Sequence, residues 1–383
     1  MIRLLFASDS FKGSLTSAET AALLTEAARE VFPGCECTGV PVADGGEGTV
    51  EAVISAIGGT VVQTEVSGPL NDPINASYGI FDGGRALIEM SAASGLVLIP
   101  KAKRDPMNTT TRGTGELILH ALDSGCRDIT VALGGSATND GGMGCMRALG
   151  VRFLTADGKE LSGCGRDLIS VAHIDCTGAD KRLSECRFTV MCDVNNPLCG
   201  ENGAAYTFAR QKGADEKAVK ALETGMQNYR GVILREFGVD CDAIPGAGAA
   251  GGLGAALTVF CGAKLRSGIE TVLDMLCFDS LLDGVDLVVT GEGRADSQSC
   301  RGKVMQGVGM RAKAKGIPVV GLCGSLGDGA IQLFDCGVDS LMTAVGAPMT
   351  LDSAIGNAPA LYREAAVRMF RLIRVGMRFG QRI

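Results

Sequence analysis

The chain has 383 residues, of which 46% are hydrophobic and 21% charged, and its net charge is −7. This length exceeds what a single hydrophobic core usually supports, so two domains are expected. The acidic balance disfavours nucleic acid and membranes as partners, because both attract basic patches. A small anionic substrate stays compatible, since a local site can oppose the overall charge.

The fifteen cysteines are scattered and include no C-x-x-C pair, so neither a disulfide framework nor a zinc site is expected. Free thiols in a reducing cytoplasm are the simpler interpretation. The first apolar run, residues 1–6, is too short for a signal peptide. No apolar run reaches the ~18 residues that a membrane span requires. A cytoplasmic protein is therefore expected.

The N-terminal segment alternates between strand and helix patterns. Residues 2–7 predict a buried strand, and 16–31 predict an amphipathic helix that opens with a T-x-x-E capping box. A second strand over 38–42 and a second helix over 50–57 complete a β-α-β-α start.

The middle of the chain has a different rhythm. Between residues 61 and 100 the apolar segments are short and separated by turns, which predicts antiparallel strands. Further strands are predicted over 129–133 and 188–192, and a long helix over 216–237.

The C-terminal part returns to the parallel α/β pattern, with strands predicted over 285–290 and 317–322 and a helix over 351–375. The predicted fold class is therefore α/β with two domains. A discontinuous Rossmann-like parallel α/β domain would comprise residues 1–64 and 285–383, and a mixed α/β domain, residues 65–284, would be inserted into it.

Four loops are rich in glycine; three of them also carry acidic or hydroxyl side chains, and three follow a strand-like run. They are ADGGEGT (43–49), GGSATNDGG (134–142), GAGAAGG (246–252) and GEGRAD (291–296). Glycine lets the backbone approach an anion, and carboxylates at strand ends can hold the cation that accompanies a polyphosphate. The loops therefore indicate a kinase or another nucleotide-using enzyme.

Two common nucleotide motifs are disfavoured. The chain lacks G-x-x-x-x-G-K-[ST], which excludes a P-loop enzyme. The loop at 246–252 matches G-x-G-x-x-G but follows no clear strand, which argues against a dinucleotide site. Phosphate contact and close packing through small residues both stay open for it. His120 and His173 lack an accompanying serine or cysteine motif and are interpreted as structural.

Five acidic residues each follow an apolar run within a few positions: Asp9, Asp44, Asp193, Glu292 and Asp296. Because ligands of open α/β sheets bind beyond the carboxyl ends of strands, these side chains can converge on one cleft. Each one alone also fits a turn or a cap. Three basic residues accompany them: Lys12, Arg294 and Lys303. Together they would supply carboxylates for Mg²⁺, a base and cations, which phosphoryl transfer requires.

Seven motifs, in order along the chain, resemble those of the type-1 glycerate kinase family. They are DSFKGSLTSAE (9–19), PVADGGEGT (41–49), TTTRGTGELI (109–118), LGGSATNDGG (133–142), CDVNNPLCGENGAAYTFARQKGA (192–214), PGAGAAGGLG (245–254) and GEGRADSQSCRGK (291–303). The resemblance runs from the first strand to the C-terminal helix and is far more specific than a single glycine pattern.

The resemblance implies a bacterial glycerate 2-kinase, which phosphorylates D-glycerate with ATP and Mg²⁺ to 2-phosphoglycerate in the breakdown of glyoxylate, glucarate and galactarate. It also implies a Rossmann-like domain with an inserted α/β domain. The alternatives are a 3-phosphoglycerate-forming enzyme, a kinase for another small hydroxy acid, and a non-catalytic ligand sensor. Glycerate would be the small-molecule partner, and a homo-oligomer is compatible with the sequence.

Residue roles follow from this resemblance and from the chemistry of glycerate, a small hydroxy acid. The expected catalytic residues are Asp193 as the base, with Lys12 and Arg294 opposing the anionic groups. Hydrogen bonds to glycerate are expected from Ser136, Thr138 and Asn139. Contacts with the ATP phosphates are expected from Gly291, Gly293 and Lys303. The expected Mg²⁺ ligands are Asp44, Asp296 and Glu292.

Overall fold

The computed structural model describes residues 1–380, and the chain divides into two compact units. The first unit comprises Met1–Asp44, Ser55–Ile57 and the chain from Gly268 onward, and the second comprises Gly45–Ile54 and Gly58–Ser267. Each unit has its own hydrophobic core. No helix in the described part of the chain is both long and apolar enough to cross a membrane.

The unit boundaries differ from the expected breaks at 64/65 and 284/285, for reasons of pairing and packing. Strand β3 (Thr60–Ser67) pairs with β4 (Pro73–Phe81) over its whole length, which ties residues 60–67 to the second unit. Helix α9 (Gly268–Met275) packs against α11 (Val304–Ala314), which ties it to the first. The first link is a hairpin that begins before the expected break, and the second depends on residues distant in the chain.

The first unit is built on a five-stranded, wholly parallel sheet. Its strand order is β15-β13-β11-β1-β2. The strands are β1 (Arg3–Phe6), β2 (Glu36–Gly39), β11 (Leu287–Thr290), β13 (Val319–Cys323) and β15 (Ser340–Thr343). From β1 the chain moves to one edge of the sheet, whereas from β11 it moves to the other. The junction between β1 and β11 is thus a topological switch point, where open α/β sheets bind ligands.

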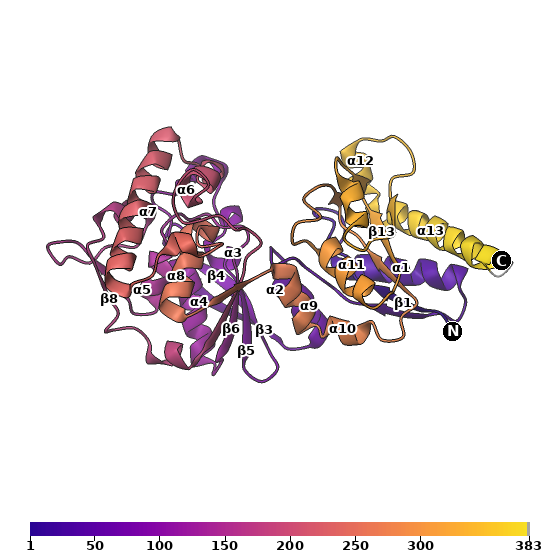
Figure 1. Ribbon diagram of the computed structural model, residues 1–383, viewed down its shortest axis with the longest axis horizontal. Coiled ribbons are helices and arrows are strands. Elements are labelled where there is room, and N and C mark those ends of the chain that lie inside the picture. The colour runs from indigo at the N-terminus through magenta and orange to yellow at the C-terminus, as the bar shows by residue number, and fades with distance from the viewer. Residues whose placement is uncertain (381–383) are drawn as a thin grey trace. The chain divides into compact units, whose positions relative to one another are not determined.

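Helices flank this sheet because successive strand residues face opposite sides. α1 (Ser17–Val31) and α13 (Ala358–Gly380) lie side by side (Figure 1) and share a core with Leu322 of β13. Cys323, the next residue of β13, faces the opposite side of the sheet and contacts Met305 of α11. The remaining elements are α10 (Phe278–Leu281), α12 (Leu351–Gly356), the 3-10 helix η8 (Ala330–Phe334) and a short parallel pair, β12 (Arg294–Ala295) with β14 (Ser325–Leu326).

The second unit has a six-stranded mixed sheet of order β10-β9-β6-β5-β4-β3. The additional strands are β5 (Arg85–Glu89), β6 (Asp128–Ala132), β9 (Arg187–Met191) and β10 (Lys264–Arg266). β3, β4 and β5 form the antiparallel meander that the sequence predicted, and the other pairs are parallel. The α/β class with a mixed second sheet is confirmed.

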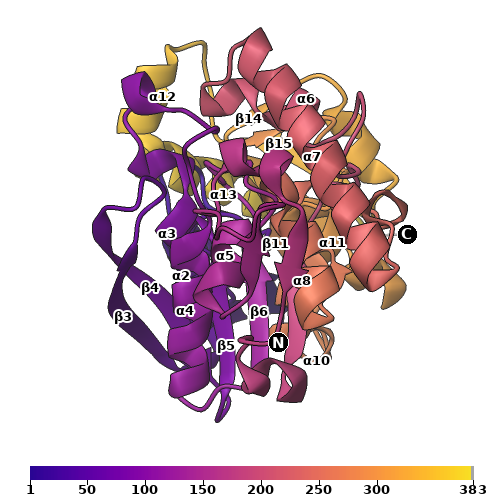
Figure 2. The same cartoon turned by 90° about the vertical axis from the view of Figure 1, so that its left-hand side faces the viewer.

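Helices α4 (Arg112–Asp123), α5 (Met143–Ala148) and α8 (Leu253–Cys261) lie over one face of this sheet (Figure 2). The other helices and the hairpin of this unit are α3 (Ser91–Ser94), α6 (Ala204–Phe208), α7 (Glu216–Phe237), and β7 (Arg152–Leu154) with β8 (His173–Asp175). The 3-10 turns are η1 (Leu96–Leu98), η2 (Lys101–Lys103), η3 (Gly165–Ser170), η4 (Lys181–Glu185), η5 (Arg210–Lys212), η6 (Cys241–Ala243) and η7 (Ala249–Gly252). α2 (Thr49–Ile57) has residues in both units.

Two predicted elements needed correction. The second strand covers Glu36–Gly39 instead of 38–42, because its partner β1 ends at Phe6 and pairing stops there. The predicted helix 351–375 is two helices, α12 and α13, with a break at Asn357. Pro359 lies at the start of α13, where its ring is tolerated but would clash within a continuous helix.

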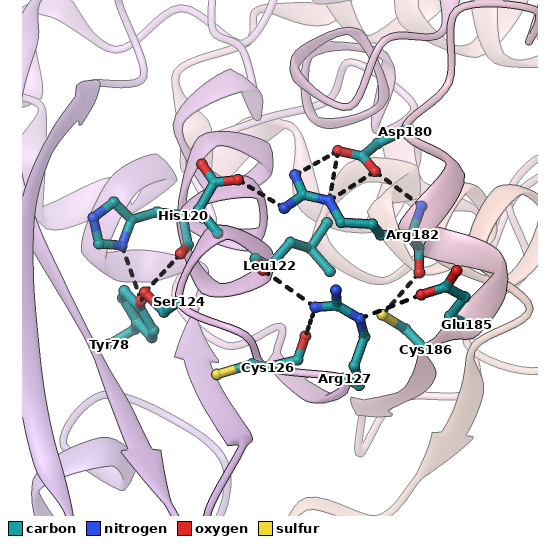
Figure 3. Close-up of polar contacts among 11 residues, drawn as sticks. Tyr78, His120, Leu122, Ser124, Cys126, Arg127, Asp180, Arg182, Glu185 and Cys186 are labelled. Atoms are coloured by element: carbon teal, nitrogen blue, oxygen red, sulfur yellow. Dashed lines mark hydrogen bonds and ion pairs between the residues drawn. The ribbon is translucent and has the colours of Figure 1, made fainter.

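The two histidines have structural partners in the second unit. In Figure 3, His120 points toward Tyr78, with His120 Nδ1 2.9 Å from the Tyr78 hydroxyl. The same view shows Arg182 paired with Asp180. Arg182 Nη1 also donates to Asp123, the last residue of α4, at 2.8 Å. His173 Nδ1 lies 3.1 Å from Glu236. These contacts support the interpretation of both histidines as structural.

Candidate active site

A cavity of about 530 Å³ opens at the carboxyl end of the first unit's sheet. Its walls come from the segments that follow all five strands and from α12 and α13. This volume is in the range of pockets that bind small molecules and cofactors. Four of the five acids that the sequence analysis singled out line it: Asp9, Asp44, Glu292 and Asp296.

Asp9 is the most perturbed of these acids. Burial is the main cause that raises the pKa of this carboxyl to about 7, and the nearby charges of Asp44 and Glu292 raise it further. The Ser10 backbone N–H, 2.7 Å from Asp9 Oδ1, and the Lys12 ammonium act in the opposite direction. Near neutral pH the Asp9 carboxyl is therefore partly protonated.

Glu292 follows β11 and is buried. Burial raises its pKa, whereas hydrogen bonding from Ser299 and the charge of Lys303 lower it; Lys303 Nζ lies 3.8 Å from Glu292 Oε2. The second oxygen, Oε1, has no hydrogen-bond partner within residues 1–380. A buried acceptor without a donor is costly, so this atom is suited to contact a ligand or cation.

The expected cations line the same cavity. Lys12 is exposed on the loop between β1 and α1, and Lys303 is the N-cap residue of α11. Arg294 belongs to β12, and its Nε lies 3.7 Å from Asp296 Oδ2. The Arg294 side chain is 68% exposed, so this ion pair is weak and the guanidinium can turn to an anion.

The two glycines expected at the ATP phosphates differ in their surroundings. A Cβ at Gly291 would lie 2.0 Å from the Leu322 carbonyl oxygen, so close packing against β13 requires glycine there. Gly293 lines the cavity, and a Cβ there would make an ordinary contact with Phe11. Their contact with phosphate stays a prediction.

The residues expected to bind glycerate lie in the second unit, on the loop after β6. Ser136 is half-buried, whereas Thr138 and Asn139 are fully buried. Within the described chain, Thr138 Oγ1 and Asn139 Oδ1 have no hydrogen-bond partner. Direct contact of these two side chains with a substrate requires this loop to open, so their role also stays a prediction.

The loop at 246–252 packs tightly against this segment. A Cβ at Gly251 would lie 2.0 Å from the Thr138 carbonyl oxygen, and one at Gly252 would lie 2.7 Å from Gly141 Cα. The Gly141 N–H donates to the Gly251 carbonyl at 2.9 Å. Of the two interpretations left open for this loop, close packing through small residues accounts for its glycines.

Asp193 follows β9, in the second unit, and its side chain is exposed. Ser267 Oγ donates to Asp193 Oδ1 at 3.0 Å. The carboxylate is thus held in one orientation while it remains accessible to solvent.

Sequence reasoning missed Lys212 and assigned no role to Asp9. Asp9 carried a usable signal, since it follows the first strand directly. Lys212 carried none, because nothing in its local pattern predicts that it is fully buried with its Nζ donating to the Thr138 carbonyl at 2.6 Å. Desolvation lowers the pKa of Lys212 to about 7, and the charge of Asp140 only partly opposes this.

We expect Lys212 to make the stability of the protein rise between about pH 7 and pH 10. Its pKa is about 7 in the folded chain and 10.5 in an unfolded reference, so within this window the unfolded state binds the extra proton and stability increases as pH rises. In Lys212→Met, the gain in unfolding free energy from about pH 7 to pH 9 should be smaller than in the wild type by about 2 kcal/mol. Urea titrations at both pH values measure this difference in unfolding free energy. Lys217→Met, at an exposed position, is the control. An equal gain in Lys212→Met would contradict the assignment.

Comparisons with known proteins bear on this site. Residues 4–374 match the model of the glycerate kinase family. The chain is 46% identical to the glycerate 2-kinase of Escherichia coli K12 over 98% of this chain and 99% of that protein. It is 42% identical to the glycerate kinase of Bacillus subtilis 168 over 96% of both chains. A crystal structure assigned to glycerate kinase 2 of Salmonella typhimurium LT2 superposes with a TM-score of 0.89 at 45% identity, covering 98% of this chain and 99% of that one.

Proposed function

Because the chain belongs to the glycerate kinase family, we propose that it transfers the γ-phosphoryl group of ATP to the 2-hydroxyl of D-glycerate, giving 2-phosphoglycerate and ADP. The observation that carries the proposal is the cavity at the switch point of the first unit, which combines four carboxylates, one of them buried, with three cations. Phosphoryl transfer depends on positioning and on offsetting charge, and this set of residues can supply both.

In this proposal Lys12, Arg294 and Lys303 hold the phosphates of ATP. Their charges would offset those on the transferring oxygens. The exposed Asp193 would accept the proton of the attacking hydroxyl, held in place by Ser267.

The cavity residues also fit Mg²⁺. Among the described residues no group of three or more acidic, histidine or cysteine side chains converges to hold a metal by itself. Mg²⁺ usually takes only one or two carboxylates and completes its shell with water and substrate phosphates. Within residues 1–380 Glu292 Oε1 has no hydrogen-bond partner, and besides burial the nearby charges of Asp44 and Glu292 raise the pKa of Asp9. We propose that one or two of Asp44, Asp296 and Glu292 hold the ion, which would neutralise charge on the phosphates.

We also propose that the enzyme acts in the cytoplasm, where ATP is made and thiols stay reduced. All fifteen cysteines are free in the structure, which supports this placement. Glycerate is the proposed partner.

The proposed activity is tested by an assay that separates the two phosphoglycerates. Purified protein is incubated with Mg-ATP and D-glycerate, ADP release is followed, and enolase is added without phosphoglycerate mutase. Phosphoenolpyruvate should form in step with ADP, because enolase acts on the 2-phosphate. A sample given 3-phosphoglycerate in place of glycerate must yield none. ADP without phosphoenolpyruvate would mean phosphorylation elsewhere, and no glycerate-dependent ADP would refute the activity.

A further inference from the structure

The cavity of the first unit changes character along the edge of the sheet. Its charged residues follow β2, β1 and β11, as described above. Beyond β11 the sheet continues with β13 and β15, and the segments after these strands contribute only small or apolar residues: Gly324, Ser325, Ala344 and Val345. Helix α12, labelled in Figure 1, adds Leu351, Ala354 and Ile355. The part of the cavity formed after β2, β1 and β11 is its charged half, and the part formed by α12 and the segments after β13 and β15 is its apolar half. The two adjoin where Arg294 of β12 pairs with Ser325.

Two aromatic side chains add apolar surface to the cavity. Phe11, which follows β1, and Tyr362 of α13 both line the cavity, and their rings meet edge to face at 5.1 Å between centroids. A second hollow of about 570 Å³ continues the apolar half past Val345 toward residues 346–350. None of the described residues that line this second hollow is charged.

The apolar half suits neither the phosphate groups of ATP nor glycerate. Glycerate carries an oxygen on each of its three carbons, and a triphosphate has no apolar surface. Yet Leu351 at this end is 74% exposed and Ile355 is 38% exposed, so apolar area is left open to water at the mouth of a ligand cavity. Such exposed apolar area commonly marks a binding site.

We propose that the apolar half, between the ends of β13 and β15 and helix α12, binds the purine base and ribose of the nucleotide. The proposal rests on the proposed kinase function, since the phosphates must occupy the charged half of the same cavity. The base would pack against Val345, Leu351 and Ala354, and its ring edge would meet backbone groups and water. Each part of ATP then lies in an environment that matches its polarity.

The test separates the base from the phosphates by comparing two ligands. ADP and inorganic tripolyphosphate are titrated by calorimetry, both with Mg²⁺ and without glycerate, into the wild type and two variants. Ala354→Trp fills the apolar half, whereas Ser353→Trp places the same side chain on the adjacent exposed position, which lines neither hollow. We expect Ala354→Trp to weaken ADP about tenfold or more and to change tripolyphosphate by less than about twofold. Ser353→Trp should leave both affinities unchanged.

A second variant covers the case in which Ala354→Trp does not fold. Leu351→Ser removes apolar surface from a side chain that is 74% exposed, so it has little effect on folding, and it should weaken ADP about threefold without affecting tripolyphosphate. Unchanged ADP affinity in the folded variants, or an equal loss for ADP and tripolyphosphate, would overturn the proposed subsite. Because these titrations need no turnover, a protein that binds ADP this way but makes no 2-phosphoglycerate would refute the kinase function and leave the subsite standing.

Discussion

Substituting Asp193 with asparagine is expected to lower kcat for glycerate phosphorylation by about 10²–10⁴-fold. Asparagine has nearly the same size and can still accept the hydrogen bond that Ser267 Oγ donates at 3.0 Å. It cannot accept a proton from the attacking hydroxyl at neutral pH. The KM values for glycerate and ATP should change little, because the loss concerns a group that acts in the transition state.

The measurement is steady-state ADP release at saturating ATP over a range of glycerate concentrations. Asp157→Asn is the matched control, because Asp157 is also an exposed acid of the second unit but belongs to a surface turn. That control should keep wild-type kinetics. A kcat for Asp193→Asn within about twofold of the wild type would rule out Asp193 as the base and redirect the search to Asp9, whose pKa of about 7 suits a general base.

Asp140→Asn is expected to destabilise the second unit by about 1–3 kcal/mol. Asp140 is fully buried, and its two carboxylate oxygens accept four hydrogen bonds. Thr111 donates its backbone N–H at 2.7 Å and its hydroxyl at 2.8 Å, and Gly142 and Gly144 donate their N–H groups at 3.0 and 3.2 Å. An asparagine amide would turn its own N–H groups toward some of these donors, which leaves them without an acceptor.

Urea unfolding measures this effect as a lower midpoint with an unchanged slope, because the surface exposed on unfolding is the same. Asp105→Asn serves as control: Asp105 accepts from the Met107 N–H and from Asn108 Nδ2 in a partly exposed turn. Its cost should stay below about 1 kcal/mol. An equal loss of unfolding free energy in Asp140→Asn and Asp105→Asn would contradict this prediction. The four hydrogen bonds to Asp140 would then not be what holds α4 and α5 together.

Much of the fold was predictable because its signals are local. The capping box of α1 is present, with Thr16 and Glu19 bonded reciprocally. The strands β1, β11 and β13 lie within their predicted runs or differ by a few residues at their ends, because a buried parallel strand is a continuous apolar run between turns. The acids at strand ends were also readable, since each directly follows such a run.

The sequence by itself determined the α/β class, the family and the grouping of acids with cations at strand ends, because each depends on residues close together along the chain. Tertiary structure alone decided the rest. It joined residues 60–67 to the second unit through β4, enclosed Thr138 and Asn139, and brought the α12 segment to the cavity of the first unit. It also gave Asp9 and Lys212 pKa values near 7. Burial and strand pairing cause each of these features, and both depend on residues that are distant in the chain.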